Sequence, residues 1–217
     1  MVYNRAMEQT LKHITIQDEV ITEQEIIKSK FITYLAPVED EESAKEYLRH
    51  IKKIHPKATH HCSAYVVGEI ERSNDDGEPA SSAGLPMLQV LRGHELQNVI
   101  AVEVRYYGGT KLGVGGLIRA YGSSVTLGIE HATLLEPKMI HTAIISFPYE
   151  HINAVETLCD GVCEIEEREY DTLVHYTVKI ENLEDLDDLD DFTQGSANLE
   201  IIEKTIEYVK KEVQDEF

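Results

Sequence analysis

Two short motifs of this chain contain residue types that could do chemistry. HHCSA places a histidine and a cysteine two residues apart, and DDGEP is a turn sequence with three carboxylates. If HHCSA begins a strand, its His60 and Cys62 share one face and could act as base and nucleophile, or bind a metal together. Such a pair needs a third group to orient it, none is assignable from the sequence, and a free cysteine is often a small buried apolar residue. We therefore expect no catalytic residue and keep five accessory candidates: His60, Cys62, Asp75, Asp76 and Glu78.

The carboxylates of DDGEP (75–79) allow several interpretations. They could bind a metal, act as a general base or cap the helix that follows, but aspartate and glycine are also ordinary turn residues, which favours a structural turn. They could also form ion pairs with Arg105, Lys111 or Arg119, which would make the motif structural. We predict no metal site and no cofactor.

A glycine-rich segment, RYYGGTKLGVGGLIRAYG (105–122), is typical of a strand, a loop and the start of a helix. Glycines let a ligand approach the backbone, and free N–H groups at a helix start attract anions, especially beside cations. The segment has neither the GK[ST] of a P-loop nor the spaced GxGxxG of a dinucleotide site. Anion binding is favoured, and tight strand-to-helix packing stays open as the alternative. The candidate ligand-binding residues are Arg105, Tyr106, Gly108, Gly109, Lys111, Gly113, Gly115, Gly116, Arg119 and Tyr121.

The net charge is strongly negative but unevenly distributed. The 217 residues include 20 basic and 40 acidic side chains, a net charge of −20, which excludes a uniformly basic coat for nucleic acid. Residues 1–137 hold 14 basic and 19 acidic residues, and residues 138–217 hold 6 and 21, so the two parts carry −5 and −15. No Asp or Glu occurs over 104–129, which contains the glycine-rich segment. The composition therefore leaves room for one local anion site.

Cysteine usage and hydropathy bear on the compartment. Three cysteines, an odd and low number, are typical of a reducing cytosol rather than of a disulfide scaffold. The first residues contain no apolar leader, and the longest stretch without a charged residue (79–91) is shorter than the roughly 18 apolar residues that span a bilayer. We expect a cytoplasmic protein without membrane contact. Cys159 and Cys163 are four residues apart, but two soft ligands alone do not predict a zinc site.

These motifs must be positioned by mixed helices and strands. In the first part, the predicted strands lie in 13–38, 60–70 and 98–107. The predicted helices are one that ends before Pro56, one with Pro86 as its first residue, and one over 115–135. A boundary is expected at Glu136-Pro137, after which the pattern is β-α-β-β-α-β with an acidic helix over 183–192. The segment 199–209 fits a helix or a strand, and that order favours a strand. We predict an α+β protein with domains 1–137 and 138–217.

The motifs HHCSAY, DDGEPASSAGLPMLQVL and RYYGGTKLGVGGLIRAYG together resemble the YigZ/IMPACT family in content, order and spacing. The resemblance is strongest over 60–122, and residues 138–217 resemble the smaller C-terminal domain of bacterial members. It implies an N-terminal α/β sandwich of the ribosomal-protein second-domain type and a C-terminal ferredoxin-like βαββαβ domain, like the end domain of elongation factor G. One departure is visible: family members often have Gly-Thr where this chain has Ser81-Ser82, which bears on any backbone contact that needs glycine.

Both fold analogies point to translation or RNA, although a fold does not fix a function. The leading hypothesis is a cytosolic, translation-linked or regulatory protein whose first domain binds RNA, or another phosphate-bearing ligand, at the glycine-rich segment, with a ribosome-associated partner. Tyr106, Tyr107 and Tyr121 would stack on bases, although a strand tyrosine is as often a core residue.

Two alternatives stay open. One is an enzyme that acts on a small phosphorylated or nucleotide substrate through His60, Cys62 and the DDGEP carboxylates. The other is a regulator that binds a protein partner without nucleic acid. The resemblance implies such a role for eukaryotic relatives, which inhibit activation of an amino-acid-starvation kinase. Those relatives use an additional N-terminal domain that we do not find in this chain, so we do not transfer that partner.

Overall fold

The computed structural model describes residues 13–211, which divide into two compact units. The first unit comprises residues 13–136 together with 210–211, and the second is Pro137–Val209. The antiparallel sheets and interspersed helices confirm the predicted α+β class. Within this described part of the chain, none of the helices combines the length and apolar character that crossing a bilayer requires.

A five-stranded antiparallel sheet with the order β2-β3-β6-β4-β5 forms the middle layer of the first unit. Its strands are β2 (Val20–Ile26), β3 (Ser29–Pro37), β4 (His60–Val67), β5 (Ile70–Asn74) and β6 (Val99–Tyr106). Every residue of β6 except the last is buried, because both faces of the sheet are covered. Ala101 faces one core, and its neighbours Ile100 and Val102 face the other.

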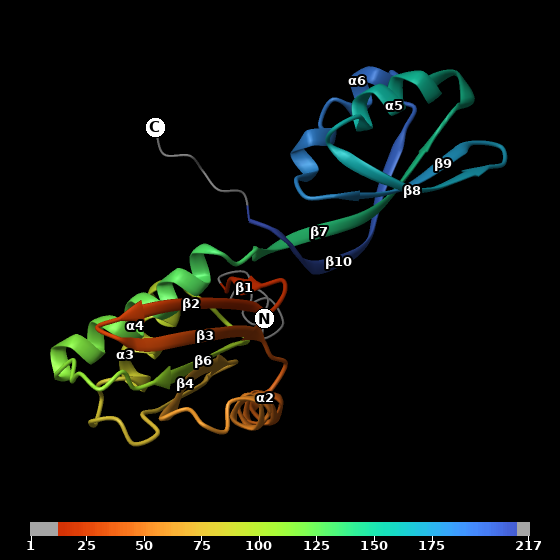
Figure 1. Ribbon diagram of the computed structural model, residues 1–217. Coiled ribbons are helices and arrows are strands. Elements are labelled where there is room, and N and C mark those ends of the chain that lie inside the picture. Colours follow the sequence, from red (N-terminus) through yellow and green to blue (C-terminus); the bar gives the residue numbers. More distant parts are fainter. Residues whose placement is uncertain (1–12, 212–217) are drawn as a thin grey trace, which may run out of the picture. The chain divides into compact units, whose positions relative to one another are not determined.

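Helices cover both faces of this sheet (Figure 1). The helix α2 (Glu41–Ile54) packs on one face, and α3 (Gly84–Gly93) and α4 (Val114–Glu130) pack on the other. At the start of α2, Asp40 and Ser43 form a capping box in which each side chain bonds the other residue's backbone N–H. Acidic residues lie in the first turn of α2 and basic residues in the last, as the helix dipole favours.

The second unit has the strand order β10-β7-β9-β8, which is the order of a ferredoxin-like βαββαβ domain and confirms the predicted fold. Its elements are β7 (Leu134–Phe147), η1 (Tyr149–His151), α5 (Ile152–Cys159), β8 (Cys163–Tyr170), β9 (Val174–Ile180), η2 (Leu183–Leu186), α6 (Leu189–Thr193) and β10 (Asn198–Lys210). Residues alternate along β9, with Val174, Tyr176 and Val178 buried against the helices. The segment 199–209, which the sequence left ambiguous, lies within β10 and is a strand.

The first unit is assembled from parts of the chain that lie far apart in sequence. The short strand β1 (Thr15–Ile16) pairs with Leu134 and Leu135 at the start of β7. The backbone N–H of Lys211, just after β10, donates to the Leu134 carbonyl at 2.8 Å. The chain thus leaves this unit after residue 136 and returns to it at residue 210.

The structure corrects the predicted ends of three elements in the first unit. The strand expected over 60–70 is a hairpin, because Gly68 adopts a φ of +54° and turns the chain from β4 into β5. Pro86 is the third residue of α3 rather than the first, since Asp75 accepts the N–H groups of Ala83 and Gly84 and starts the helix earlier. The helix expected to reach residue 135 ends at Glu130, after which β7 begins.

The acidic segment of the second unit also differs from the prediction. The single helix expected over 183–192 is divided into the short 3-10 helix η2 and the short helix α6. Carboxylates crowd both elements, and like charges at helical spacing destabilise a continuous helix. The segment is held instead by two buried leucines, Leu186 and Leu189.

Glu103 is an acidic side chain in the core of the first unit. It lies on β6 with no exposed surface, and its Oε2 accepts a hydrogen bond of 2.6 Å from Thr33. Its Oε1 has no partner among the described residues. Burial raises the pKa of Glu103 to about 8, although the hydrogen bond from Thr33 acts in the opposite direction. The side chain is therefore held in its neutral form at neutral pH.

This burial predicts a pH-dependent stability. The folded chain holds a proton on Glu103 that the unfolded chain releases at a lower pH, so stability falls as pH rises from about 5 to about 8. Glu103→Gln mimics the neutral acid and should unfold at a higher urea concentration than the wild type at pH 8, with little difference at pH 5. The exposed Glu130→Gln serves as the control. An equal difference at both pH values would contradict the burial of a titrating carboxyl.

Candidate functional site

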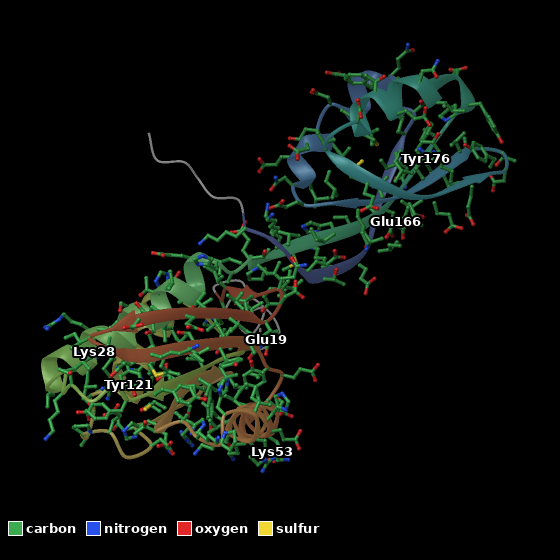
Figure 2. All side chains as sticks on the ribbon, viewed as in Figure 1. Glu19, Lys28, Lys53, Tyr121, Glu166 and Tyr176 are labelled. Carbon is green, nitrogen blue, oxygen red and sulfur yellow. The ribbon has the colours of Figure 1, made fainter. Side chains whose placement is uncertain are left out.

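Most of the candidate residues gather at one end of the sheet of the first unit. There β4 begins opposite the end of β6, with His60 paired to Arg105, and β3 begins opposite Tyr106. The DDGEP turn, the glycine-rich loop and the start of α4 also lie at this end. Figure 2 shows Lys28, at the turn between β2 and β3, and Tyr121 of α4 in this region.

Arg105 lies in the interior of the protein, with only 4% of its surface exposed. Its guanidinium donates to Glu78 Oε1 and, at 3.1 Å, to Ser29 Oγ. The same group lies over the rings of Phe31 and Tyr107, at 5.3 and 5.6 Å from their centroids. Arg105 is therefore not the free cation for a ligand that the sequence suggested, and the alternative of an ion pair with DDGEP is the one observed.

Glu78 is the centre of a buried polar cluster, which we call the Glu78 cluster and define as Glu78, Arg105, Tyr121, Cys62 and His60. The carboxylate is 5% exposed and accepts a hydrogen bond of 2.8 Å from the Tyr121 hydroxyl in addition to the bond from Arg105. His60 Nε2 lies 3.8 Å from the same oxygen. The charge of Arg105 offsets that of the carboxylate, so neither is buried alone.

Tyr121 cannot stack on a base. Its ring has no exposed surface and meets Phe31 edge-on, with centroids 5.4 Å apart. Burial raises the pKa of its hydroxyl, and the neighbouring Cys62 and Glu78 raise it further. Tyr106 lies on the opposite face of the sheet, where its hydroxyl bonds His55 Nδ1 at 2.8 Å. Of the three tyrosines considered for stacking, Tyr107 is the exposed one, at 45%.

Cys62 does not have the properties of a nucleophile. Its side chain is fully buried, and its thiol donates to the Asp75 carbonyl at 3.0 Å, with the Tyr121 hydroxyl a second partner at 3.3 Å. Burial raises the pKa of the Cys62 thiol, and the charges of nearby carboxylates raise it further. The hydrogen bond to Tyr121 lowers this pKa but does not outweigh burial. The interpretation of Cys62 as a small core residue is the one that this environment supports.

The two aspartates of DDGEP fix the turn to its surroundings. Asp75 Oδ1 accepts the N–H groups of Ala83 and Gly84 at 3.0 and 2.8 Å, and its Oδ2 accepts that of Ser81 at 2.8 Å. Asp76 accepts the backbone N–H of His61 at 2.7 Å and pairs with Lys52 at 2.8 Å. These contacts make DDGEP a structural turn whose carboxylates are already engaged.

The family departure at position 81 coincides with an unusual backbone. Ser81 adopts a φ of +60°, a region that favours glycine, and its N–H still donates to Asp75. The backbone contact is therefore kept with serine at this position, at a conformational cost on the order of 1 kcal/mol or more.

The glycines of the loop divide into structural and accessible ones. A Cβ on Gly108 would come within 1.8 Å of the Lys28 carbonyl oxygen, so packing between the loop and the β2–β3 turn requires glycine there. Gly109 and Gly113 have φ values of +83° and +70°, and no atom would meet a Cβ at either position. Gly115 lies exposed in the first turn of α4 and Gly116 is partly buried there.

The start of α4 combines free backbone donors with free cations. Gly113 caps the helix without a side-chain bond, and no acid lies in the first turn. The first helical bond runs from Leu117 N to Gly113 O, which leaves the N–H groups of 114–116 without a helical acceptor. Lys111 and Arg119 are exposed, and no ion pair to either is formed among residues 13–211.

Lys28 is a third cation that the sequence did not indicate. It is exposed at the turn between β2 and β3, and its carbonyl lies against Gly108 of the glycine loop. Like Lys111, it has no ion pair with a described residue. Nothing in its local sequence marks it, since only the close approach at Gly108 brings this turn to the loop.

The arrangement therefore separates the candidate residues into two sets. The Glu78 cluster is engaged within itself, and the partly exposed DDGEP aspartates are engaged with the backbone and with Lys52. Lys111, Arg119 and the uncapped start of α4, joined by Lys28, face outward. Residues 13–211 contain no group of three or more His, Cys, Asp or Glu arranged to hold a metal ion.

Removal of Arg105 tests the structural role of the buried ion pair. Arg105→Met leaves the Glu78 carboxylate buried without its cation, which should cost about 3–5 kcal/mol of unfolding free energy. Arg92→Met is the matched control, because Arg92 pairs with Glu71 at the surface and such a pair contributes about 1 kcal/mol or less. Urea unfolding compares the two, and adding Glu78→Gln to Arg105→Met should recover part of the loss. Equal stability of the two single variants would exclude the proposed role.

The close approach at Gly108 gives a second prediction. Gly108→Ala should destabilise the fold strongly, because the methyl group would overlap the backbone of the β2–β3 turn. Gly93→Ala is the control, since no atom lies near the added methyl and alanine favours a helix. Thermal melting should show a large loss for the first variant and none for the second. Unchanged stability of Gly108→Ala would contradict the close packing of the loop against Lys28.

Comparison with known proteins extends the resemblance noted in the three motifs. Residues 27–129 match the Impact N-terminal domain. The IMPACT family member YvyE of Bacillus subtilis (strain 168) is 38% identical over 206 residues, which cover 93% of this chain and 95% of that protein. An IMPACT family member of Haemophilus influenzae is 40% identical over 202 residues, with coverage of 88% and 96%. YigZ of Escherichia coli (strain K12) is 39% identical over 159 residues, with coverage of 70% and 77%.

A solved structure supports the same relationship. A crystal structure described as that of a hypothetical protein is 35% identical to this chain and superimposes with a TM-score of 0.55. It covers 88% of this chain, which in turn covers 97% of it. The match therefore extends beyond the N-terminal domain. On the identity and coverage of these relatives, the chain belongs to the IMPACT family.

Proposed function

We propose that this protein is a cytoplasmic, translation-linked regulatory protein that binds RNA through the start of α4. The binding surface consists of Lys28, Lys111, Arg119 and the backbone N–H groups of 114–116. The observation that carries the proposal is a set of exposed cations, with no ion pair to any residue of 13–211, beside an uncapped helix start in a chain of net charge −20. Other basic side chains of the first unit, such as Lys52, Arg92 and Arg105, already form ion pairs with carboxylates.

The chemistry of this surface fits a phosphate-bearing ligand. Free N–H groups at a helix start carry a partial positive charge, and the helix dipole adds about 0.3–1 kcal/mol for an anion there. Lys111 precedes the helix and Arg119 follows within its second turn, so both reach the same region as the N–H groups. The absence of Asp and Glu over 104–129 leaves this potential unopposed within the segment.

A single-stranded RNA accounts for one further feature of the surface. Tyr107 exposes 45% of its surface at the start of the loop, where its ring lies against the Arg105 guanidinium. An exposed aromatic ring beside phosphate-binding cations is the usual platform for base stacking. A small phosphorylated ligand would use the cations and leave this ring unused.

Two exposed apolar residues of α4 favour a second candidate function, the binding of a regulatory protein partner. Val114 and Ile118 are four residues apart on one side of the helix and expose 55% and 41% of their surfaces. Apolar side chains at the centre of a charged surface are typical of protein interfaces. Capture of a partner from lysate separates the two functions, since a partner lost after ribonuclease treatment depends on RNA and one retained binds the protein.

The RNA-binding proposal is tested by neutralising the cations of the surface. Lys111→Gln with Arg119→Gln should weaken binding of a fluorescent single-stranded RNA and reduce the slope of log affinity against log salt by about 1.4, as expected for two phosphate contacts. Lys53→Gln with Lys57→Gln removes the same charge elsewhere on the first unit, and Figure 2 shows Lys53 on α2, away from Lys28. The control pair should change neither quantity by as much.

Two outcomes of this titration would reject the site. One is unchanged affinity in the Lys111 and Arg119 variant, and the other is an equal loss in both pairs of variants, which would indicate only a response to net charge. A competition experiment with inorganic pyrophosphate distinguishes RNA from a small phosphorylated ligand. Displacement of the bound RNA by millimolar pyrophosphate would favour the small ligand.

A further inference from the structure

The second unit holds a pair of cysteines that has no role in the proposed RNA surface. Cys159 is the last residue of α5 and Cys163 the first of β8. The turn between them is tight: Gly161 has a φ of +78°, and Val162 N donates to the Cys159 carbonyl at 3.1 Å. This turn joins the helix to the strand, so the two cysteines flank one corner of the second unit.

The two cysteines line the same cavity but differ in exposure. Cys159 is 2% exposed, and Cys163 is partly exposed. The interaction between the two thiols lowers the pKa of Cys163 and, together with burial, raises the pKa of Cys159. The more accessible sulfur is thus also the better thiolate, stabilised by the thiol beside it.

An open cavity of about 690 Å³ gives access to this pair. Both cysteines line it, together with Glu156 and Arg168. Arg168 Nε lies 3.6 Å from Glu156, and the guanidinium lies over the Tyr176 ring, so the wall of the cavity holds a cation beside the carboxylates of Glu156 and Asp160. The cavity is polar and open enough to admit a small charged molecule to Cys163.

Two simpler explanations account for less of this arrangement. Two cysteines that were only core residues would both be shielded from solvent, yet both line an open cavity and Cys163 is partly exposed. A zinc site needs about four ligands, and the described residues contain no metal-binding group of three or more. Paired thiols in an accessible pocket, one a better thiolate than the other, are instead the arrangement of reactive dithiols.

We infer that Cys159 and Cys163 form a redox-active dithiol that exchanges with low-molecular-weight disulfides entering the cavity. The Cys163 thiolate attacks one sulfur of the small disulfide, whose S–S bond breaks and releases one small thiol after it takes up a proton. Cys159 then loses its proton to water and attacks Cys163 Sγ in the mixed disulfide, which releases the second small thiol. Overall, two protein thiols are oxidised to one disulfide and one small disulfide is reduced to two thiols.

The third cysteine serves as an internal control. Cys62 is fully buried in the Glu78 cluster, and its thiol is already engaged by the Asp75 carbonyl and Tyr121. It should remain unmodified under conditions that oxidise the pair. The inference does not depend on the proposed function, because every residue of the site belongs to the second unit.

The test treats the full chain with oxidised glutathione and follows it by intact mass and peptide mapping. The wild type should lose two free thiols, gain no lasting glutathione and yield a linked Cys159–Cys163 peptide. Cys159→Ser should retain one glutathione on Cys163, because the resolving thiol is gone. Cys163→Ser should react far more slowly, since the remaining Cys159 is buried. Cys62→Ser should behave as the wild type does.

Three results would overturn the inference: no reaction of the folded wild type, a stable glutathione adduct on wild-type Cys163, or an adduct on Cys62 instead. The wild-type peptide map alone decides between them, so a variant that folds poorly does not weaken the test. The oxidised chain should return to the free dithiol form on addition of excess reduced glutathione, which distinguishes exchange from irreversible oxidation.

Discussion

The buried ion pair between Arg105 and Glu78 is the interaction on which the end of the first unit with the candidate site depends. The Arg105 guanidinium and the Glu78 carboxylate are both buried, and the charge of each offsets the cost of burying the other. Glu78 belongs to the DDGEP turn, Arg105 to the central strand β6, and Tyr121, which also bonds Glu78, to α4. One carboxylate thus connects a turn, a strand and a helix that come from three separate parts of the sequence.

This arrangement explains why the polar groups of HHCSA and DDGEP are not free to bind a ligand. HHCSA, DDGEP and the first residues of the glycine-rich segment are joined by hydrogen bonds that occupy their polar groups. They hold the start of α4 against the sheet and leave its backbone donors, Lys111 and Arg119 facing outward. The residues of HHCSA and DDGEP therefore support the exposed start of α4.

Much of the fold could be predicted from local patterns. The alternation along 174–180 and the helical spacing before Pro56 specify elements by themselves, and the β-α-β-β-α-β order decided the ambiguous strand β10. The errors arose where a distant side chain or one backbone angle sets an element's end. Asp75 starts α3 two residues earlier than Pro86 indicated, and the φ of Gly68 divides one apparent strand into two.

Only the position of the candidate site could be predicted from the sequence. The pairing of Arg105 with Glu78 was one of several pairings considered. Lys28 joins the site through a contact with Gly108 that no sequence pattern records.

The return of the chain to the first unit at Lys211 has a consequence for biosynthesis. The second unit, Pro137–Val209, is inserted between two parts of the first unit: Leu134 and Lys211, whose backbone N–H donates to the Leu134 carbonyl. During translation the sheet and its helices are complete once residue 130 has emerged, and the contact of Lys211 with Leu134 forms only about 80 residues later, several seconds at the usual rate of synthesis. The nascent first unit therefore passes through a stage in which its main core is formed but the carbonyl of Leu134 still awaits its partner.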